Sequence, residues 1–276
     1  MQPQDLLRGD IRLVSLPTIV AELNLMVATG STRDIGNLVA KDAALTARLL
    51  RIANSGYFGG GGGIQSLQQA IALVGTRELV NLVMASVAAS RFAAIRQDLV
   101  DMDSFGQRAA YMSVAADTVG RLGKAQEKGW LFVAGLLHDI GSLVLYSVRP
   151  ADSQDILQQA AGSPQRVVEL ESERFGFTFA DLGAALARQW KLPETVANLI
   201  QSQLWPVSSD RHDHDSRFMR LARCFLQASL TERSGEEAVA DILAESGDSP
   251  PIDGASLVAG YTEIPERAQA IYGSLF

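Results

Sequence analysis

The sequence predicts an all-α protein. Apolar residues recur at spacings of three and four along almost the whole chain, and no alternating run flanked by hairpin turns is present. At 276 residues, with 47% hydrophobic and 20% charged content, the chain is long enough to bury a substantial core. Its single cysteine, Cys224, excludes an internal disulfide, so a reducing compartment is expected.

Capping residues predict five helices before residue 98. The first opens at Leu16-Pro17 and carries Ile19, Leu23 and Met26 on one face. The expected starts of the other four are Ser31 with Asp34, Asp42, Ser66 with Gln69, and Thr76. Between them lie five consecutive glycines, Gly59 to Gly63, which predict a loop. The Lys and Ser/Thr of a phosphate-binding loop do not follow these glycines, so we interpret the loop as a plain surface turn.

The remainder of the chain predicts further helices after a polar break near residues 96–103. We expect these helices at residues 105–122, 128–148, 153–161, 164–176, 178–190, 193–204, 218–230, 236–244 and 265–275. The break divides the chain into an N-terminal helical lobe, residues 1–98, and a second helical lobe, residues 99–276. Because the break lacks the Pro, Gly and Ser content of a flexible linker, we expect both lobes to unfold as one cooperative unit.

Charge is distributed unevenly. Up to Arg96 there are nine basic and six acidic residues, whereas the whole chain carries a net charge of −7. The overall charge disfavours nucleic-acid binding, and so does the helix beginning at Thr76, which is almost wholly apolar after its first turn. The basic N-terminal lobe is the expected partner-facing region, with Arg48, Arg51 and Arg77 as candidate contacts.

Nothing in the sequence indicates a membrane segment. No N-terminal stretch combines a basic start with an apolar run, and the longest apolar run is interrupted by His138 and Asp139. A bilayer span needs roughly 20 apolar residues, so we expect no membrane helix and a cytoplasmic location.

The dipeptide His138-Asp139 lies inside an apolar segment, Trp130 to Tyr146. Adjacent His and Asp on a buried helix begin the divalent-metal site of one large class of phosphohydrolases. A divalent metal takes about four to six ligands, and this pair supplies two at most. The other histidines, His212 and His214, lie in a polar loop and are interpreted as a solvated surface.

The order and spacing of several motifs resemble the HDOD family, the HD-related output domains of bacterial signalling proteins. The similarity covers residues 16–225 and is carried by these segments: Leu16-Pro17, Asp42-x-x-Leu45-x-x-Arg48-Leu49-Leu50-x-x-Ala53-Asn54-Ser55, Ile64-x-Ser66-x-x-x-Ala70-Ile71-x-x-Val74-Gly75, Gly135-Leu136-Leu137-His138-Asp139-Ile140-Gly141, Gly176-Phe177, Leu182-Gly183-Ala184 and Trp190-x-Leu192-Pro193. The resemblance implies an HD-domain-like helical bundle with an N-terminal helical lobe.

Four positions depart from the pattern of catalytic HD enzymes. The resemblance implies further metal ligands where this chain has Met112, Thr178-Phe179, Gln203-Leu204 and Arg223. We therefore expect no catalytic residue, no bound metal and no cofactor. We interpret His138 and Asp139 as a buried structural pair, in which Asp139 accepts hydrogen bonds from His138 or from nearby backbone N–H groups.

The resemblance implies a non-catalytic signalling module that mediates protein–protein interaction. Its expected partners are signalling proteins such as receiver, diguanylate cyclase or kinase domains. Two alternatives stay open: a metal-dependent phosphohydrolase or cyclic-nucleotide phosphodiesterase using His138 and Asp139, and a DNA-binding regulator using residues 66–92.

Overall fold

The computed structural model describes residues 2–8, 22, 32–58, 63–76, 79, 82–83, 99–126, 128–204, 215–231, 233–245 and 252–275. Every regular element within these ranges is a helix, so the predicted all-α class is confirmed. The elements are α1 (Pro3–Leu6), α3 (Thr32–Val39), α4 (Ala43–Ala53), the 3-10 helix η1 (Gly56–Phe58), α5 (Leu67–Val74), α7 (Met102–Leu122), α8 (Lys128–Leu136), α9 (Ile140–Val148), α10 (Pro150–Ala160), α11 (Pro164–Phe175), α12 (Phe179–Gln189), α13 (Glu194–Gln201), α14 (Ser216–Leu230), α15 (Gly235–Glu245) and α16 (Gly254–Leu275).

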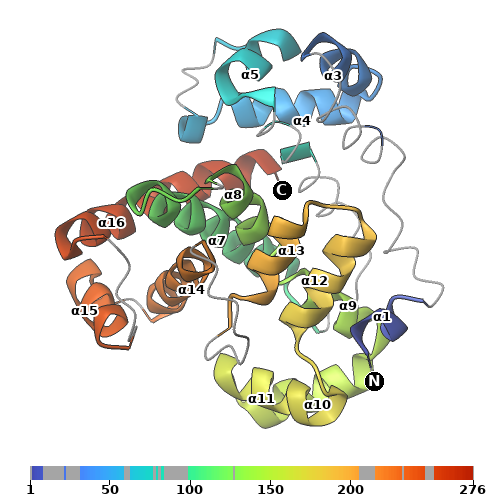
Figure 1. Cartoon of the computed structure of the whole chain (residues 1–276), viewed down its shortest axis with the longest axis vertical. Helices are drawn as coiled ribbons and strands as arrows, with labels where there is room; N and C mark the ends of the chain where they lie inside the picture. Colours follow the sequence, from blue (N-terminus) through green and yellow to red (C-terminus); the bar gives the residue numbers. More distant parts are fainter. Residues whose placement is uncertain are drawn as a thin grey trace.

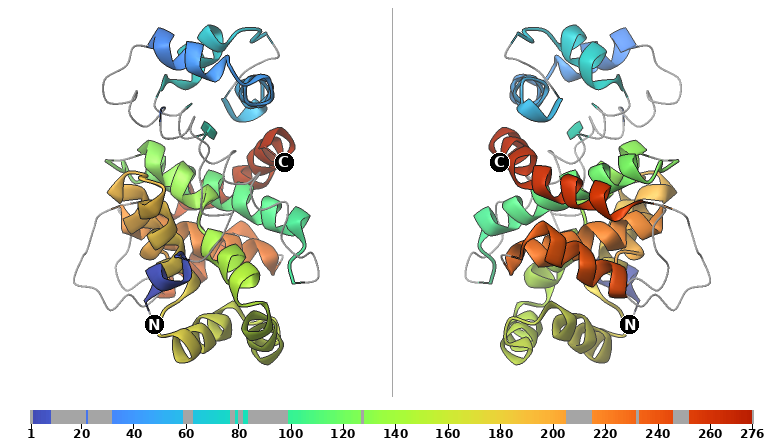
Figure 2. Two further views of the ribbon diagram at one scale, coloured as in Figure 1. Left: turned by 90° about the vertical axis from the view of Figure 1, so that its right-hand side faces the viewer. Right: turned by 90° about the vertical axis from the view of Figure 1, so that its left-hand side faces the viewer.

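Helices α3, α4 and α5, with η1, form an N-terminal lobe at one end of the molecule (Figures 1 and 2). Their starts follow the predicted caps. The Asp42 carboxylate accepts the backbone N–H of Leu45 at 3.0 Å, and Ser66 and Gln69 form a reciprocal capping box at the start of α5. The predicted helix at residues 16–26 lies outside the described residues except for Glu22, and most of the predicted helix at 76–92 also lies outside them.

The long helices α7 and α16 run through the middle of the molecule beside α8 (Figure 1). Helix α7 begins at Met102, three residues before the predicted start, because both carboxylate oxygens of Asp101 accept backbone N–H groups of its first turn. Helix α16 begins at Gly254, and Pro265 lies inside it rather than at its start. The packing of α16 against α7 outweighs the loss of the single amide that Pro265 lacks.

The helices α9 to α15 complete the body, with α10 and α11 at the end opposite the N-terminal lobe (Figures 1 and 2). Ser163 caps α11, and Gly176 ends it in the left-handed conformation at φ 80°. Thr178 and Asp181 form the predicted capping box of α12. Helix α13 ends at Gln201, three residues earlier than predicted, and α10 begins at Pro150, which opens that helix rather than preceding a gap.

The prediction of one continuous helix at residues 128–148 is wrong, because the helix is interrupted. Residues 137–139 form a turn that separates α8 from α9. In this turn the backbone N–H of His138 bonds to the carbonyl of Gly135, three residues back, so the regular α-helical pattern is interrupted. The interruption lies at the His-Asp dipeptide itself.

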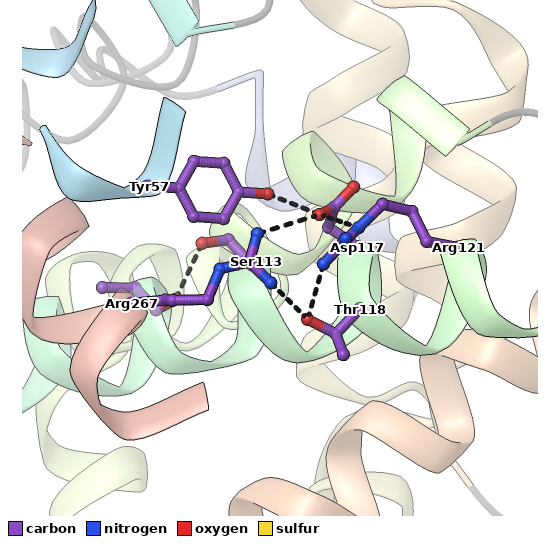
Figure 3. Close-up of polar contacts among 7 residues, drawn as sticks. Tyr57, Ser113, Asp117, Thr118, Arg121 and Arg267 are labelled. Carbon is purple, nitrogen blue, oxygen red and sulfur yellow. Dashed lines mark hydrogen bonds and ion pairs between the residues drawn. The ribbon is translucent and has the colours of Figure 1, made fainter. Parts of the chain in front are cut away.

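A cluster centred on Asp117 of α7 joins the N-terminal lobe to the body (Figure 3). The Asp117 carboxylate accepts the Tyr57 hydroxyl from η1 at 2.6 Å and the Arg121 Nε–H at 3.0 Å. Arg267 of α16 lies with its guanidinium 4.6 Å from the centre of the Tyr57 ring and donates to the Thr118 hydroxyl at 3.2 Å. Three segments far apart in sequence therefore meet at one partly buried carboxylate.

The stretch Gly129–Val148, which spans α8 and α9, has the length and composition of a membrane-crossing helix, with a hydropathy of 1.7. This finding corrects the expectation that no apolar stretch reaches that length. In the structure, 78% of the stretch is buried inside the protein. The core helix of a soluble protein has the same property, so the stretch is weak support for a membrane span.

Candidate functional site

The His138-Asp139 dipeptide lies at the floor of a pocket of about 370 Å³ between helices of the body. The turn between α8 and α9 supplies the dipeptide, and α7, α9, α10, α11, α12 and α14 supply the walls. The lining residues are Arg108, His138, Asp139, Ser142, Tyr146, Leu157, Ala160, Gly162, Ser163, Pro164, Val167, Phe179, Arg223, Leu226, Gln227 and Leu230. A pocket of this volume is in the range that holds a small organic ligand.

His138 is 3% exposed, and its ring is fixed by the turn that contains it. Its Nδ1 lies 2.8 Å from the carbonyl oxygen of Gly135, which accepts a hydrogen bond, so Nδ1 carries the proton. Burial lowers the pKa of His138 to about 4, although Asp139 acts in the opposite direction. The imidazole is therefore neutral near pH 7, and its Nε2 carries a lone pair.

Asp139 occupies the N-cap position of α9. Its Oδ1 accepts the hydroxyl of Ser142, one turn into the helix. The expected pairing with His138 is not what the structure shows, because the His138 ring donates to Gly135 instead. The two side chains thus have separate partners although they are adjacent in sequence.

Glu171 of α11 is a buried carboxyl group behind the pocket, 3% exposed. It accepts the backbone N–H of Phe179 at 2.7 Å, at the start of α12. Burial raises the pKa of Glu171 to about 8, with a smaller contribution from the charge of Asp139. At neutral pH this carboxyl group is mainly protonated and adds no full charge to the site.

Arg223 of α14 faces the dipeptide from the opposite side. Its guanidinium lies 5.4 Å from the centre of the Phe179 ring and donates to the Oε1 of Gln203 at 3.3 Å. Burial lowers the pKa of Arg223, while the charge of Asp139 raises it, so the two side chains attract each other. Gln203, 1% exposed, also donates to the carbonyl of His138 at 2.7 Å and so joins α14 to the α8–α9 turn.

Several positions where the resemblance implied metal ligands converge in space. Gln203 bonds to His138, and Arg223 and Phe179 line the same pocket as Asp139. Met112 is fully buried, and its backbone lies against Gly135 of α8. Thr178 caps α12 instead and does not line the pocket.

These residues do not fit a divalent metal. Among the described residues, no group of three or more His, Cys, Asp and Glu side chains lies close enough together to hold one. Near Asp139, where the resemblance implies a further metal ligand, the structure has the guanidinium of Arg223, whose positive charge repels a metal cation. The Asp139 carboxylate, which a metal would need as a ligand, already has the cationic Arg223 near it.

Sequence reasoning missed three residues of this site: Arg108, Tyr146 and Glu171. All lie on amphipathic helices where a charged or aromatic residue is ordinary, so only the packing of α7, α9 and α11 around the turn shows their role. The buried position of Glu171 within an otherwise polar helix segment carries no clear sequence signal.

Of the other residues singled out from the sequence, only some lie within the described structure. His212, His214 and Arg77 lie outside the described residues. Arg51 is exposed on α4, whereas Arg48 is half-buried and its pKa is lowered by burial. Of the two described arginines, Arg51 is therefore the better placed to meet a partner.

Comparison with known proteins identifies the fold and the family. A crystal structure of a protein from Shewanella amazonensis, described as a "Putative phosphohydrolase", is 22% identical, has a TM-score of 0.83 and aligns over 98% of both chains. A crystal structure of an HDOD domain protein with unknown function from Geobacter sulfurreducens is 20% identical, has a TM-score of 0.76 and aligns over 99% of this chain and 97% of that chain. At these identities the similarities show the fold alone.

A curated relative, an uncharacterized protein of Treponema pallidum (strain Nichols), is 27% identical over 191 residues. The match covers 67% of this chain but 36% of that protein, so this chain spans only part of its relative's length. The HDOD domain family model matches residues 13–206, which include the pocket dipeptide and most of the helices around it. This chain belongs to the HDOD family.

Proposed function

We propose that this protein is a non-catalytic signalling module that passes a regulatory state between protein partners in the cytoplasm. The observation that carries the proposal is the position of Arg223, which puts a cation near Asp139 at a position where the resemblance implies a metal ligand. The HDOD match supports a signalling-related domain. The site is then a degenerate metal site whose framework has been kept and whose ligands have been replaced.

Metal loading combined with a turnover assay tests this proposal. The purified protein is incubated with Mn²⁺, Fe²⁺ or Mg²⁺, desalted and analysed for metal content, and then assayed with bis(p-nitrophenyl) phosphate and with cyclic nucleotides. We expect substoichiometric metal and no turnover above the buffer rate. The Asp139→Asn variant is the control, because turnover from a contaminating phosphatase would survive that substitution.

The alternative function is a metal-dependent phosphohydrolase or cyclic-nucleotide phosphodiesterase. The observation that favours it is the neutral imidazole of His138, whose Nε2 lone pair is suited to bind a metal. Stoichiometric metal, together with turnover that disappears in Asp139→Asn, would establish this alternative and overturn the proposal.

The proposed partners are separate signalling proteins, such as receiver, diguanylate cyclase or kinase domains, and the proposed contact surface is the N-terminal lobe. Arg51 is exposed on α4 of this lobe, in line with electrostatic steering of an acidic partner. Once a pull-down identifies a partner, Arg51→Glu is expected to slow association, with a smaller effect at high salt. Arg166→Glu on α11, at the far end of the body, is the matched control; a larger effect there would refute the surface assignment.

A further inference from the structure

The pocket that contains His138 is lined by charged and by apolar side chains. Its charged lining residues include Arg108 of α7, Asp139 and Arg223 of α14. Its apolar lining residues lie mainly on α10, α11 and α14 and include Leu157, Ala160, Pro164, Val167, Leu226 and Leu230. A pocket of this composition is suited to a ligand with one charged end and an apolar body.

The charges that line the pocket do not cancel. Two guanidinium groups, those of Arg108 and Arg223, face one carboxylate, that of Asp139. Among the described residues that line the pocket, no other Asp, Glu, Lys or Arg is present. The pocket therefore carries an excess positive charge near neutral pH.

Arg108 is the source of this excess. Arg223 is attracted to Asp139 and hydrogen-bonded to Gln203, whereas Arg108 has no hydrogen bond or ion pair to any residue that the structure describes. It is half-buried in the second turn of the long helix α7, seven residues after the N-cap residue Asp101. Burial is the main cause of the lowered pKa of His138 and of the raised pKa of Tyr146, and the charge of Arg108 makes a smaller contribution at both groups.

The size and shape of the pocket limit the ligand. Its volume of about 370 Å³ is near the lower end of the range for small-molecule pockets. Guanidinium groups bind carboxylate and phosphate oxygens in preference to neutral acceptors. Tyr146 and Gln227 also line the pocket, and their hydroxyl and amide groups offer further hydrogen bonds.

We propose that this pocket binds a small organic anion, with its carboxylate or phosphate head group between Arg108 and Arg223 and its apolar body against Leu157, Val167 and Leu226. Arg223, at a position where the resemblance implies a metal ligand, is then part of an anion-binding site. This inference rests on the proposed function only in treating the anion as a regulatory input. The binding itself does not depend on whether the protein is catalytic.

Isothermal titration calorimetry on the full chain tests the site with defined probes. Phenyl phosphate and phenylacetate represent the two sources of the anion, benzyl alcohol is a neutral control of similar shape, and inorganic phosphate tests the need for an apolar body. We expect saturable binding of at least one organic anion. Benzyl alcohol and inorganic phosphate should bind about tenfold or more weakly, because each lacks one of the two contacts.

Arg108→Gln is the decisive variant, because Arg108 is half-buried and its removal breaks no hydrogen bond within the described structure. It should weaken binding of the organic anion about tenfold or more while leaving the melting temperature nearly unchanged. Arg217→Gln is the matched control: Arg217 is half-buried on α14 but does not line the pocket. It should leave binding unchanged.

The outcomes separate this inference from the proposed function. The absence of saturable binding for both organic anions, or equal binding by wild type and Arg108→Gln, would overturn the inference and leave the non-catalytic proposal intact. Release of phenol from phenyl phosphate by metal-loaded protein, together with loss of binding in Arg108→Gln, would support the pocket and overturn the non-catalytic proposal. Binding of only one probe class identifies whether the head group is a phosphate or a carboxylate.

Discussion

Two polar regions of this protein place an aspartate among arginines, and they differ in how completely the charges are paired. At the joint between the lobes, Asp117 accepts a hydroxyl and an arginine Nε–H and lies 4.0 Å from the guanidinium of Arg267. In the pocket, Asp139 accepts the Ser142 hydroxyl and attracts Arg223, and a second arginine, Arg108, lines the same cavity.

The surroundings of Asp117 and Asp139 also differ. Near Asp117, the guanidinium of Arg267 lies 4.6 Å from the centre of the Tyr57 ring (Figure 3). The Tyr57 ring in turn lies 5.4 Å from the ring centre of Phe132 on α8. Above Asp139 there is a cavity of about 370 Å³. A cluster whose arginines are all paired holds helices together, whereas a cavity lined by an arginine without such a partner is the kind of place where a ligand binds.

A substitution that crowds the contact between α9 and α12 should have the largest effect on stability. Gly141 of α9 lies so close to α12 that a Cβ atom at this position would be 1.9 Å from the carbonyl oxygen of Phe179, a pocket residue. Gly141→Ala must push α9 and α12 apart, so we expect a loss of about 3 kcal/mol or more in the free energy of unfolding. Chemical denaturation measures the loss. Gly273→Ala, where the added Cβ meets nothing within 4 Å, is the control and should be nearly neutral.

His138→Ala should have the next largest effect, about 2 to 4 kcal/mol, because it leaves a cavity in the core and removes the hydrogen bond to Gly135. His138→Asn, which keeps a donor near the position of Nδ1, should recover part of the loss. Denaturation curves and a phosphodiesterase assay are recorded on the same samples. A His138→Ala protein of unchanged stability that loses a measurable turnover would show a catalytic histidine instead of a structural one.

The fold was largely predictable from local sequence signals, because most helix starts depend on a cap and the residues next to it. Asp42, Ser66, Ser163 and Thr178 all accept the backbone N–H groups expected of them. The interruption at His138 was missed, since the apolar pattern continues through it and only contacts from Gln203 and α12 define the turn. The position of Pro265 inside α16 likewise depends on tertiary packing.

The candidate site was predictable only in part. The His138-Asp139 dipeptide and the departures at Gln203 and Arg223 could be identified from the resemblance, and the structure brings all four residues together. Arg108 lies thirty residues before the dipeptide on another helix, and its role depends on the packing of α7 beside α8. Long-range proximity of this kind leaves no periodic signal in a single sequence.

Removing the Asp117 carboxylate, which joins the N-terminal lobe to the body, should lower the stability moderately by weakening the contact between them. In Asp117→Ala the Tyr57 hydroxyl and the Arg121 Nε–H lose their shared acceptor and Arg267 loses its ion-pair partner, all in a partly buried site, so we expect a loss of about 2 kcal/mol. The control is Asp155→Ala, which breaks a solvent-exposed pair with Arg174 and should change the stability little.

Calorimetry of Asp117→Ala also tests whether the two lobes form one cooperative unit, as the sequence predicts. A single transition at lower temperature would agree with that prediction. Two separated transitions in the wild-type protein would contradict it, and two transitions in the variant alone would show that Asp117 is the main connection between the lobes.

The smallest expected effect is on how the free energy of unfolding changes with pH. It comes from the buried carboxyl group of Glu171. Glu171 has a folded pKa of about 8, against an ordinary value of 4.5 in the unfolded chain. Between these values the folded protein holds a proton that the unfolded chain releases, so the free energy of unfolding falls as pH rises, by roughly 1.4 kcal/mol per pH unit. His138, with its pKa lowered from 6.5 to about 4, acts in the opposite direction below pH 6.5.

The clean window is therefore pH 6.5 to 8, where Glu171 titrates without the opposing histidine. In this window Glu171→Gln should flatten the decline in stability, because the amide oxygen still accepts the Phe179 N–H but binds no proton. Glu169→Gln, at an exposed position of the same helix, should leave the decline unchanged. Parallel stability curves for the wild type and Glu171→Gln would mean that Glu171 is ionised in the folded protein. Arg223 would then have a second buried carboxylate near it, and the electrostatic difference between the two aspartate clusters would be smaller.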